Sequence, residues 1–448
     1  MTDFDFDADK ADITSDIAGG SSNPTRKVGT FESLRIRNFR LLLTGATLSN
    51  AAQWIQQITL NWLVYDLTGS GTILGSINLT RAVASLGVIP VAGVLIDRLK
   101  RRQLLTIDYS WLFLFTFTLG LILITGHSHV SYLFVFAFLG GIVQTVDYSL
   151  LQVLVFDLVP RSLTPNAIAL VQTGWGLMRS FGPALGGFLI LWLGPGGNFL
   201  LQASIYILIA IFILQIKFPA RKTRTHQASL LDDIKESLRH ITKVRVTRAF
   251  IMLGLILPLC IIPIFIVLPP IYAVEVFGDE SGKVLGFLMA SVGVGGIAGG
   301  VVTASLGYLE RRGFLQLGTL FLLSISLIGF AFSTTLLLSL LLLAMAGFFE
   351  IIFLTTNQTL IQLSIPDSLR GRVTSIVNLN MSLTSLTGLV AGAGSDLLGG
   401  PKMITIFLAG IAAVLVVVFL ICSPTIRNYR LSHAIAPDSS GLDYDKTK

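Results

Sequence analysis

Four charged residues lie deep inside long apolar stretches of this chain, namely Arg81, Asp147, Arg179 and Glu350. Burying an ionisable group among hydrocarbon is costly, so such residues are candidates for ion binding, proton transfer or substrate contact. Counted from the basic ends of their stretches, they lie about 11 to 15 residues deep. At ~1.5 Å per residue this depth places all four near the middle of a bilayer. We therefore expect them to form one group of coupling charges.

Two relationships are expected within this group of charges. Asp147 and Arg179 lie on successive antiparallel stretches, so we expect them to pair, with a purely structural salt bridge as the alternative role. Glu350 is an acid without an obvious basic neighbour, which makes it the preferred candidate for binding and releasing a proton. The alternative for Glu350 is a neutral, hydrogen-bonded side chain.

Polar residues recur along one face of the first apolar stretch, from Asn50 to Asn61, at spacings of a helix face. Facing lipid, such a stripe would be prohibitive, so it must face protein or water. Lining of a cavity is favoured over simple hydrogen bonding between helices. With polar residues of the fourth and tenth stretches, the predicted substrate-cavity residues are Asn50, Gln53, Trp54, Gln57, Asn61, Gln144, Tyr148, Asn357 and Gln358.

The elements that must position these residues are membrane-spanning helices. The 448 residues are 53% hydrophobic and 13% charged, whereas a soluble domain carries about 25% charged residues. Runs of about 20 apolar residues are long enough to cross a bilayer as helices. Strands of a membrane barrel would be short and alternating, which excludes that class. The predicted fold is all-α, with twelve spans at 39–67, 72–96, 103–126, 130–158, 166–193, 198–216, 249–274, 283–308, 314–333, 335–364, 371–398 and 401–423.

The loops between these spans alternate in charge, and the basic ones all fall on one side. By the positive-inside rule, this distribution predicts that both termini are cytoplasmic. Residues 1–30 are acidic at their start, lack the features of a secretory signal, and are predicted to be a disordered tail, with a docking segment as the alternative. Residues 217–248 are predicted to be a linker with an amphipathic surface helix. The predicted domains are the halves 31–216 and 249–423, and a second tail at 424–448.

The two predicted halves repeat each other. Gly141, Gln152 and Pro160 recur 206 positions later as Gly347, Gln358 and Pro366, and Gln144 corresponds to Glu350. Further along, the same offset relates Gly182 and Gly186 to Gly388 and Gly392. Chance would give one or two such identities, but not a colinear set. The chain is therefore expected to contain two parallel copies of a six-helix unit.

A charged decapeptide lies between the second and third spans, and the residues that define it are Gly93, Asp97, Arg98, Arg101 and Arg102. It resembles the loop-2/3 signature of the major facilitator superfamily, although Lys100 replaces the usual second glycine. The alternative is a basic cluster that only sets orientation. We expect Asp97 and Arg101 to share one face of a continuing helix, and Asp157 to meet Arg101 in a cytoplasmic gate. Residues 310–313 resemble a diverged second copy.

A second resemblance lies in the fifth span, where Gly182, Pro183, Gly186 and Gly187 are similar to the antiporter motif of the same superfamily. The first glycine of that motif is Met178 here. Small residues at this spacing allow close helix packing, which is also the alternative explanation for them. The resemblance implies a transporter whose substrate site lies between two halves.

The opening of the first span, Phe39-Arg40 and then Trp62 to Ser70, resembles the branch that contains enterobactin exporters and macrolide-efflux proteins. That resemblance implies proton-coupled export of an amphipathic small molecule by a monomer in the bacterial inner membrane, surrounded by lipid. An importer or facilitator of the same fold, and a non-transporting scaffold or sensor, are the alternatives. Enzyme motifs and nucleic-acid patches are absent from the sequence, and we expect neither a cofactor nor a metal.

Overall fold

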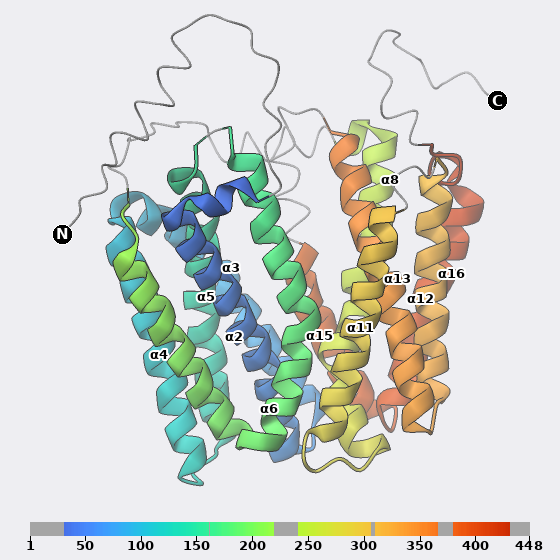
Figure 1. The fold of residues 1–448 in the computed structure, drawn as a ribbon. Helices are drawn as coiled ribbons and strands as arrows, with labels where there is room; N and C mark the ends of the chain where they lie inside the picture. Colours follow the sequence, from blue (N-terminus) through green and yellow to red (C-terminus); the bar gives the residue numbers. More distant parts are fainter. Residues whose placement is uncertain (1–30, 161, 219–240, 306–309, 366–379, 431–448) are drawn as a thin grey trace, which may run out of the picture.

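The computed structural model describes residues 31–160, 162–218, 241–305, 310–365 and 380–430 (Figure 1). In these ranges the regular structure is helical, which confirms the predicted all-α class. Nine of the described helices are long and apolar enough to cross a membrane. The first predicted span is not among these nine because its polar stripe lowers its hydropathy, although its helix is 32 residues long.

The first group of helices follows the predicted spans closely. The fifth and sixth spans are the two helical segments of Thr164–Gln215, which meet at a kink at Gly194, whose φ of 66° is not helical; this kink lies between the predicted spans 166–193 and 198–216. After a short turn at Glu32–Arg35, the helices are α2 (Arg37–Thr68), α3 (Gly71–Arg98), α4 (Arg101–Ile124), α5 (Val130–Leu158) and α6 (Thr164–Gln215).

The second group begins with an interrupted helix that runs from Arg245 to Val276 and contains the predicted span 249–274. Prolines at 258, 263, 269 and 270 remove backbone donors, and the helix breaks into α-helical and π-helical pieces there. The pieces are α8 (Arg245–Gly254), η2 (Leu257–Ile261), α9 (Ile262–Ile266), α10 (Leu268–Ile271) and η3 (Tyr272–Val276). The remaining helices are α11 (Lys283–Ser305), α12 (Arg312–Phe332), α13 (Leu336–Leu363), α15 (Asn380–Leu397), α16 (Pro401–Cys422) and the short α17 (Pro424–Arg427).

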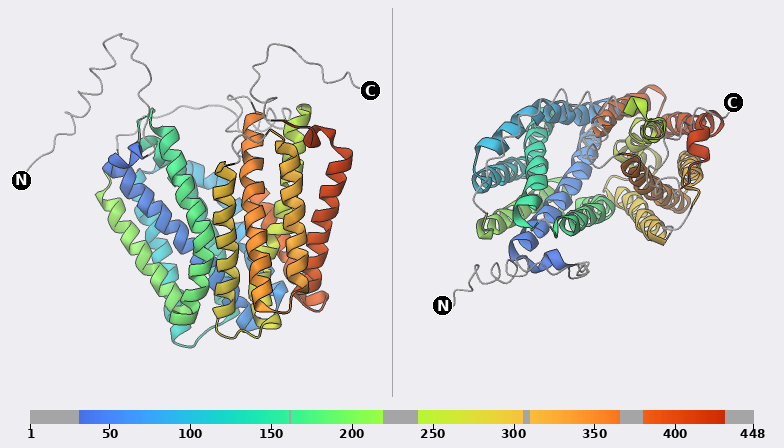
Figure 2. Two further views of the ribbon diagram at one scale, coloured as in Figure 1. Left: turned by 45° about the vertical axis from the view of Figure 1, so that its right-hand side comes forward. Right: turned by 90° about the horizontal axis from the view of Figure 1, so that it is seen from above.

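The two groups lie side by side, with residues 31–218 in the N group and residues 241–430 in the C group (Figures 1 and 2). We call the end where the described chain starts and finishes the terminal end, which is uppermost in Figure 1, and the other the opposite end. Helix α3 packs against α15, and α6 packs against α11. These two helix pairs join the groups.

The contacts between the groups are close because they are made by glycines. A Cβ on Gly392 of α15 would lie 2.0 Å from the carbonyl oxygen of Gly71 in α3, and a Cβ on Gly187 of α6 would lie 2.4 Å from the Cα of Gly286 in α11. At the same end, Asp396 accepts hydrogen bonds from the backbone amides of Gly71 (2.7 Å) and Thr72 (2.9 Å) at the start of α3. The opposite end is therefore closed by backbone-to-backbone packing.

This packing predicts the effect of Gly392→Ala. The added methyl group meets a backbone oxygen that cannot rotate away, so α3 and α15 must separate, at a cost of about 1–3 kcal/mol. We expect about tenfold faster labelling of Ser70→Cys by a membrane-impermeant maleimide, in a background without Cys260 and Cys422. Gly410→Ala is the matched control, because a Cβ there meets nothing within 4 Å. Equal labelling rates in the two variants would contradict the prediction.

Candidate functional site at the interface of the two helix groups

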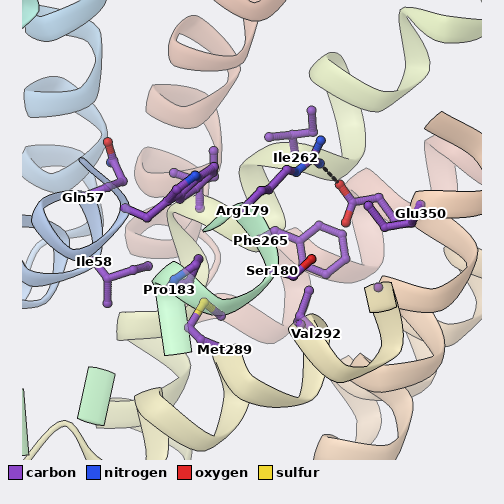
Figure 3. Close-up of a pocket in the computed structure, with 15 residues that line it drawn as sticks. Gln57, Ile58, Arg179, Ser180, Pro183, Ile262, Phe265, Met289, Val292 and Glu350 are labelled. Atoms are coloured by element: carbon purple, nitrogen blue, oxygen red, sulfur yellow. Dashed lines mark hydrogen bonds and ion pairs between the residues drawn. The ribbon is translucent and has the colours of Figure 1, made fainter. Parts of the chain in front are cut away.

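Two adjacent cavities lie where the N and C groups meet. The interface cavity has a volume of about 210 Å³, and helices of both groups line it (Figure 3). The polar cavity has a volume of about 370 Å³. Trp54, Gln57 and Ile266 line both, so the two cavities share a wall. The residues that line the polar cavity are Asn50, Gln53, Trp54, Gln57, Arg81, Ser85, Gln144, Thr145, Tyr148 and Ile266.

An ion pair between Arg179 of α6 and Glu350 of α13 crosses the interface cavity and connects the two groups (Figure 3). The Arg179 side chain is 27% exposed and that of Glu350 is 7% exposed, so the pair is only partly solvated. The predicted pairing of Arg179 with Asp147 is therefore wrong, as is the expectation that Glu350 lacks a basic neighbour. Arg179 lies on the side of α6 that faces the C group, away from Asp147.

Asp147 is instead held inside the N group by three donors. Its Oδ2 accepts from Ser49 Oγ at 3.0 Å and from Gln53 Nε2 at 3.3 Å, and its Oδ1 accepts from the Tyr109 hydroxyl at 2.8 Å. The side chain is fully buried. Gln53 also lines the polar cavity, so one side chain connects this buried carboxyl group to the cavity wall.

Asp108 on α4 is a second buried acid of the N group and was not among the predicted site residues. Its side chain is 4% exposed, and its Oδ2 has no hydrogen-bond partner among the described residues. It is close enough to Asp147 for the two carboxyl groups to interact electrostatically. The signal in the sequence was an acid about one and a half turns inside the third predicted span, near its basic end.

Gln57 is the centre of an amide network on the wall shared by the cavities. Its Oε1 accepts from Arg81, and its Nε2 donates to Asn78 at 2.7 Å and to Asn61 at 3.2 Å. Asn61 in turn donates to the carbonyl of Ile266 in the C group at 2.8 Å. Asn78 is a further residue missed from the sequence. It lies on α3 three residues before Arg81, and this one-turn spacing from a predicted charged residue was the signal that could have found it.

The structure brings most of the predicted substrate-cavity residues together. Six of them line the polar cavity: Asn50, Gln53, Trp54, Gln57, Gln144 and Tyr148. Three others do not belong to the walls of either cavity, and this corrects the prediction. Asn61 lies one turn beyond Gln57, where its amide joins the two groups. Asn357 donates to the carbonyl of Phe250 inside the C group at 3.1 Å, and Gln358 is exposed beside it.

The predicted gate residues lie at the terminal end of the N group. Arg101 Nε and Asp157 Oδ2 are 3.2 Å apart, which confirms the predicted contact, and Arg102 donates to the carbonyl of Leu214 at 2.7 Å. The expected continuous helix is wrong, because Leu99 and Lys100 are extended and separate α3 from α4. Lys100 has an ordinary φ of −66°, so this turn has no need of a glycine there.

Some predicted features fall outside what the structure describes. The surroundings of Gly93 and the side chains of Asp97 and Arg98 are among them, although the backbone of all three residues belongs to α3. So are most of the predicted linker helix and the N-terminal tail. The place of Asp97 in a gate stays a prediction.

The glycines of the antiporter-like motif pack α6 against its neighbours. A Cβ on Gly182 would lie 2.5 Å from the Cβ of Trp54 in α2, and Gly186 lies against Ile55, the next residue of α2. Pro183 lines the interface cavity, and Gly187 contacts α11. The motif therefore places Trp54 at the cavity wall.

The internal repeat is visible in equivalent glycine contacts. A Cβ on Gly141 of α5 would lie 2.4 Å from the Arg81 carbonyl oxygen in α3. A Cβ on its counterpart Gly347 of α13 would lie 2.3 Å from the Val292 carbonyl oxygen in α11. The second and fourth helices of each half thus approach each other in the same way. Among the cavity residues, Gln144 of one half corresponds to Glu350 of the other.

Two groups of helices related by a repeat, with a partly polar cavity between them, define a major facilitator transporter. The chain belongs to the transmembrane secretion effector family, MFS_3, whose family model matches residues 28–438. This is a family of transporters and not of enzymes, and the chain is accordingly a multi-pass membrane protein that carries a small molecule.

Relatives and solved structures agree with this assignment. The chain is 27% identical over 348 residues to a staphyloferrin A transporter of Staphylococcus aureus, covering 77% of this chain and 86% of the relative. It is 25% identical over 372 residues to the multidrug efflux pump Tap of Mycolicibacterium fortuitum, covering 80% and 89%. A bacterial homologue of the human lysosomal transporter Spinster shares the fold, with a TM-score of 0.64 at 15% identity over 87% of this chain and 96% of that one.

Proposed function

We propose that this protein is a proton-coupled exporter that moves an amphipathic small molecule from the cytoplasm by alternating access. The observation that carries the proposal is the Arg179–Glu350 ion pair, which crosses the cavity between the two helix groups. Proton binding to Glu350 would neutralise the carboxylate and remove the attraction that holds α6 to α13. Protonation would thereby be coupled to separation of the groups.

The direction of transport and the orientation in the membrane belong to the same proposal. Basic residues gather at the terminal end, whereas Lys283 and Lys402 lie at the opposite end, and this distribution supports a cytoplasmic terminal end. Export is supported by the name of one relative, a multidrug efflux pump. The basic residues described at the terminal end are Arg35, Arg37, Arg40, Lys100, Arg101, Arg102, Lys217, Lys243, Arg245, Arg248, Arg311, Arg312, Arg427 and Arg430.

Everted membrane vesicles test this function directly. Uptake of staphyloferrin A, erythromycin and ethidium is measured with a proton gradient, with an uncoupler, and in vesicles without the protein. We expect uptake of at least one compound that requires the protein and stops with the uncoupler. Uptake into whole cells that ignores the uncoupler would instead identify a facilitator or importer. A scaffold or sensor would give a different result. The protein would transport none of the compounds in any assay, and removing residues 1–25 and 431–448 would abolish its effect on the cell.

A further inference from the structure

The walls of the two cavities are not balanced in charge. In the interface cavity, the guanidinium of Arg179 is neutralised by Glu350. In the polar cavity, Arg81 is charged, and the other residues that line it are amides, hydroxyls, Trp54 and Ile266. The combined wall therefore carries one surplus positive charge.

Arg81 itself is incompletely bonded. One of its terminal nitrogens donates to Gln57 Oε1, but its Nε is buried without an acceptor. The ion pairs found among the described residues are Arg101–Asp157 and Arg179–Glu350, and neither includes Arg81. A guanidinium stays charged in proteins, and a buried charge without a counter-ion is unfavourable. An anion in this cavity would relieve that cost.

The surroundings hold Arg81 in place and define what else the anion meets. Gln57 donates to Asn61 and Asn78, and these bonds keep its oxygen directed at Arg81. Gln144 lines the same cavity and offers an amide donor. On the shared wall and beyond it lie Trp54, Phe265 and Met289, which present apolar surface (Figure 3). An acidic group and an apolar body would thus find separate contacts.

We propose that the polar cavity binds the carboxylate, or another acidic oxygen group, of an amphipathic organic anion, with Arg81 as its counter-ion. The apolar body of that molecule lies against Trp54, Phe265 and Met289. This inference rests on the proposed function, because it names the chemical class of the exported molecule. A positively charged substrate would place like charges together in a poorly solvated cavity.

Binding to the purified full-length protein in detergent tests this proposal. The probes are naphthylacetate and pyrenebutyrate, each paired with its uncharged amide, and dissociation constants are measured by equilibrium dialysis. Arg81→Gln removes the charge and Arg81→Lys retains it. Arg37→Gln, on the exposed start of α2, is the matched control for charge removal.

We expect the wild-type protein and Arg37→Gln to bind the acids about ten- to hundredfold more tightly than the amides, the range of a hydrogen bond to a charged group. Arg81→Gln should lose this preference, with amide affinity nearly unchanged, and Arg81→Lys should retain part of it. Equal weakening of acids and amides would show that Arg81 only supports the fold and would overturn the proposal. The proposal would also be overturned if the purified protein bound neither naphthylacetate nor pyrenebutyrate while its vesicles exported ethidium or erythromycin. Acid preference lost in Arg81→Gln supports the site even if everted vesicles export nothing.

Discussion

Replacing Glu350 by Gln should abolish gradient-driven export, with a loss of about a hundredfold or more in initial rate at every pH. Glutamine cannot bind and release a proton, and it cannot neutralise Arg179, which would remain as an unpaired cation in the wall of the interface cavity. Removing one partner of a buried ion pair leaves the other charge buried and unpaired, which lowers the free energy of unfolding by about 3–5 kcal/mol. Because the Arg179 side chain is 27% exposed, we expect the lower end of that range for the loss of stability. Vesicle uptake and thermal unfolding measure the two effects.

A double variant separates the two roles of Glu350. Arg179→Gln combined with Glu350→Gln removes both charges and leaves neither side chain as an unpaired ion. We therefore expect the double variant to be more stable than either single variant and to approach the stability of the wild-type protein. Export should stay absent, because the double variant still lacks a proton-binding carboxyl group at this place. Undiminished export by Glu350→Gln across the pH range would rule out Glu350 as the proton carrier. An additive loss of stability in the double variant would rule out the ion pair as an energetic unit.

The second large effect concerns the two buried acids of the N group, because we expect replacement of Asp147, but not of Asp108, to destabilise the protein. Asp147→Asn places an NH₂ group among donors from Ser49, Gln53 and Tyr109, so at least one donor loses its acceptor. We expect a loss of about 2–4 kcal/mol in unfolding free energy. Asp108→Asn should leave stability unchanged or slightly raised, because Asp108 Oδ2 has no partner to lose.

Thermal unfolding of the purified variants, followed by circular dichroism, measures this contrast. Asp66→Asn, at the exposed opposite end of α2, controls for removal of an acid far from the network. Export should fall strongly in Asp147→Asn, since Gln53 would lose the acceptor that fixes it at the polar-cavity wall. Equal destabilisation by Asp108→Asn and Asp147→Asn would contradict the arrangement of donors described above.

Much of the fold was predictable because each span of this protein carries its own signal. Apolar runs of bilayer length marked the helices, and the 206-residue offset related Gly141 to Gly347, which make equivalent contacts in the structure. The main local error was at Leu99 and Lys100, where two extended residues separate α3 and α4. A run of basic residues gives no periodicity from which such a break can be read.

The sequence indicated most of the residues that form the site, but not which of its charged residues contact one another. Spacing along one helix placed Gln53, Trp54 and Gln57 on a common face, and they do line a cavity. Depth in the membrane placed Asp147, Arg179 and Glu350 at one level, but depth leaves the rotation of each helix undetermined. Rotation decides that Arg179 faces α13 and that Asp147 faces α2 and α4. Pairing therefore depended on tertiary packing that one sequence does not reveal.

The two repeats carry different residues at one equivalent position of the cavity walls, and this difference affects how a substrate lies. Gln144 and Glu350 occupy equivalent places in a pseudo-symmetric skeleton, yet one is neutral and the other is ionisable. An elongated molecule spanning both cavities therefore meets chemically different walls and is held with a defined head-to-tail polarity. During a transport cycle such a molecule would leave the protein with the same end leading in every turnover.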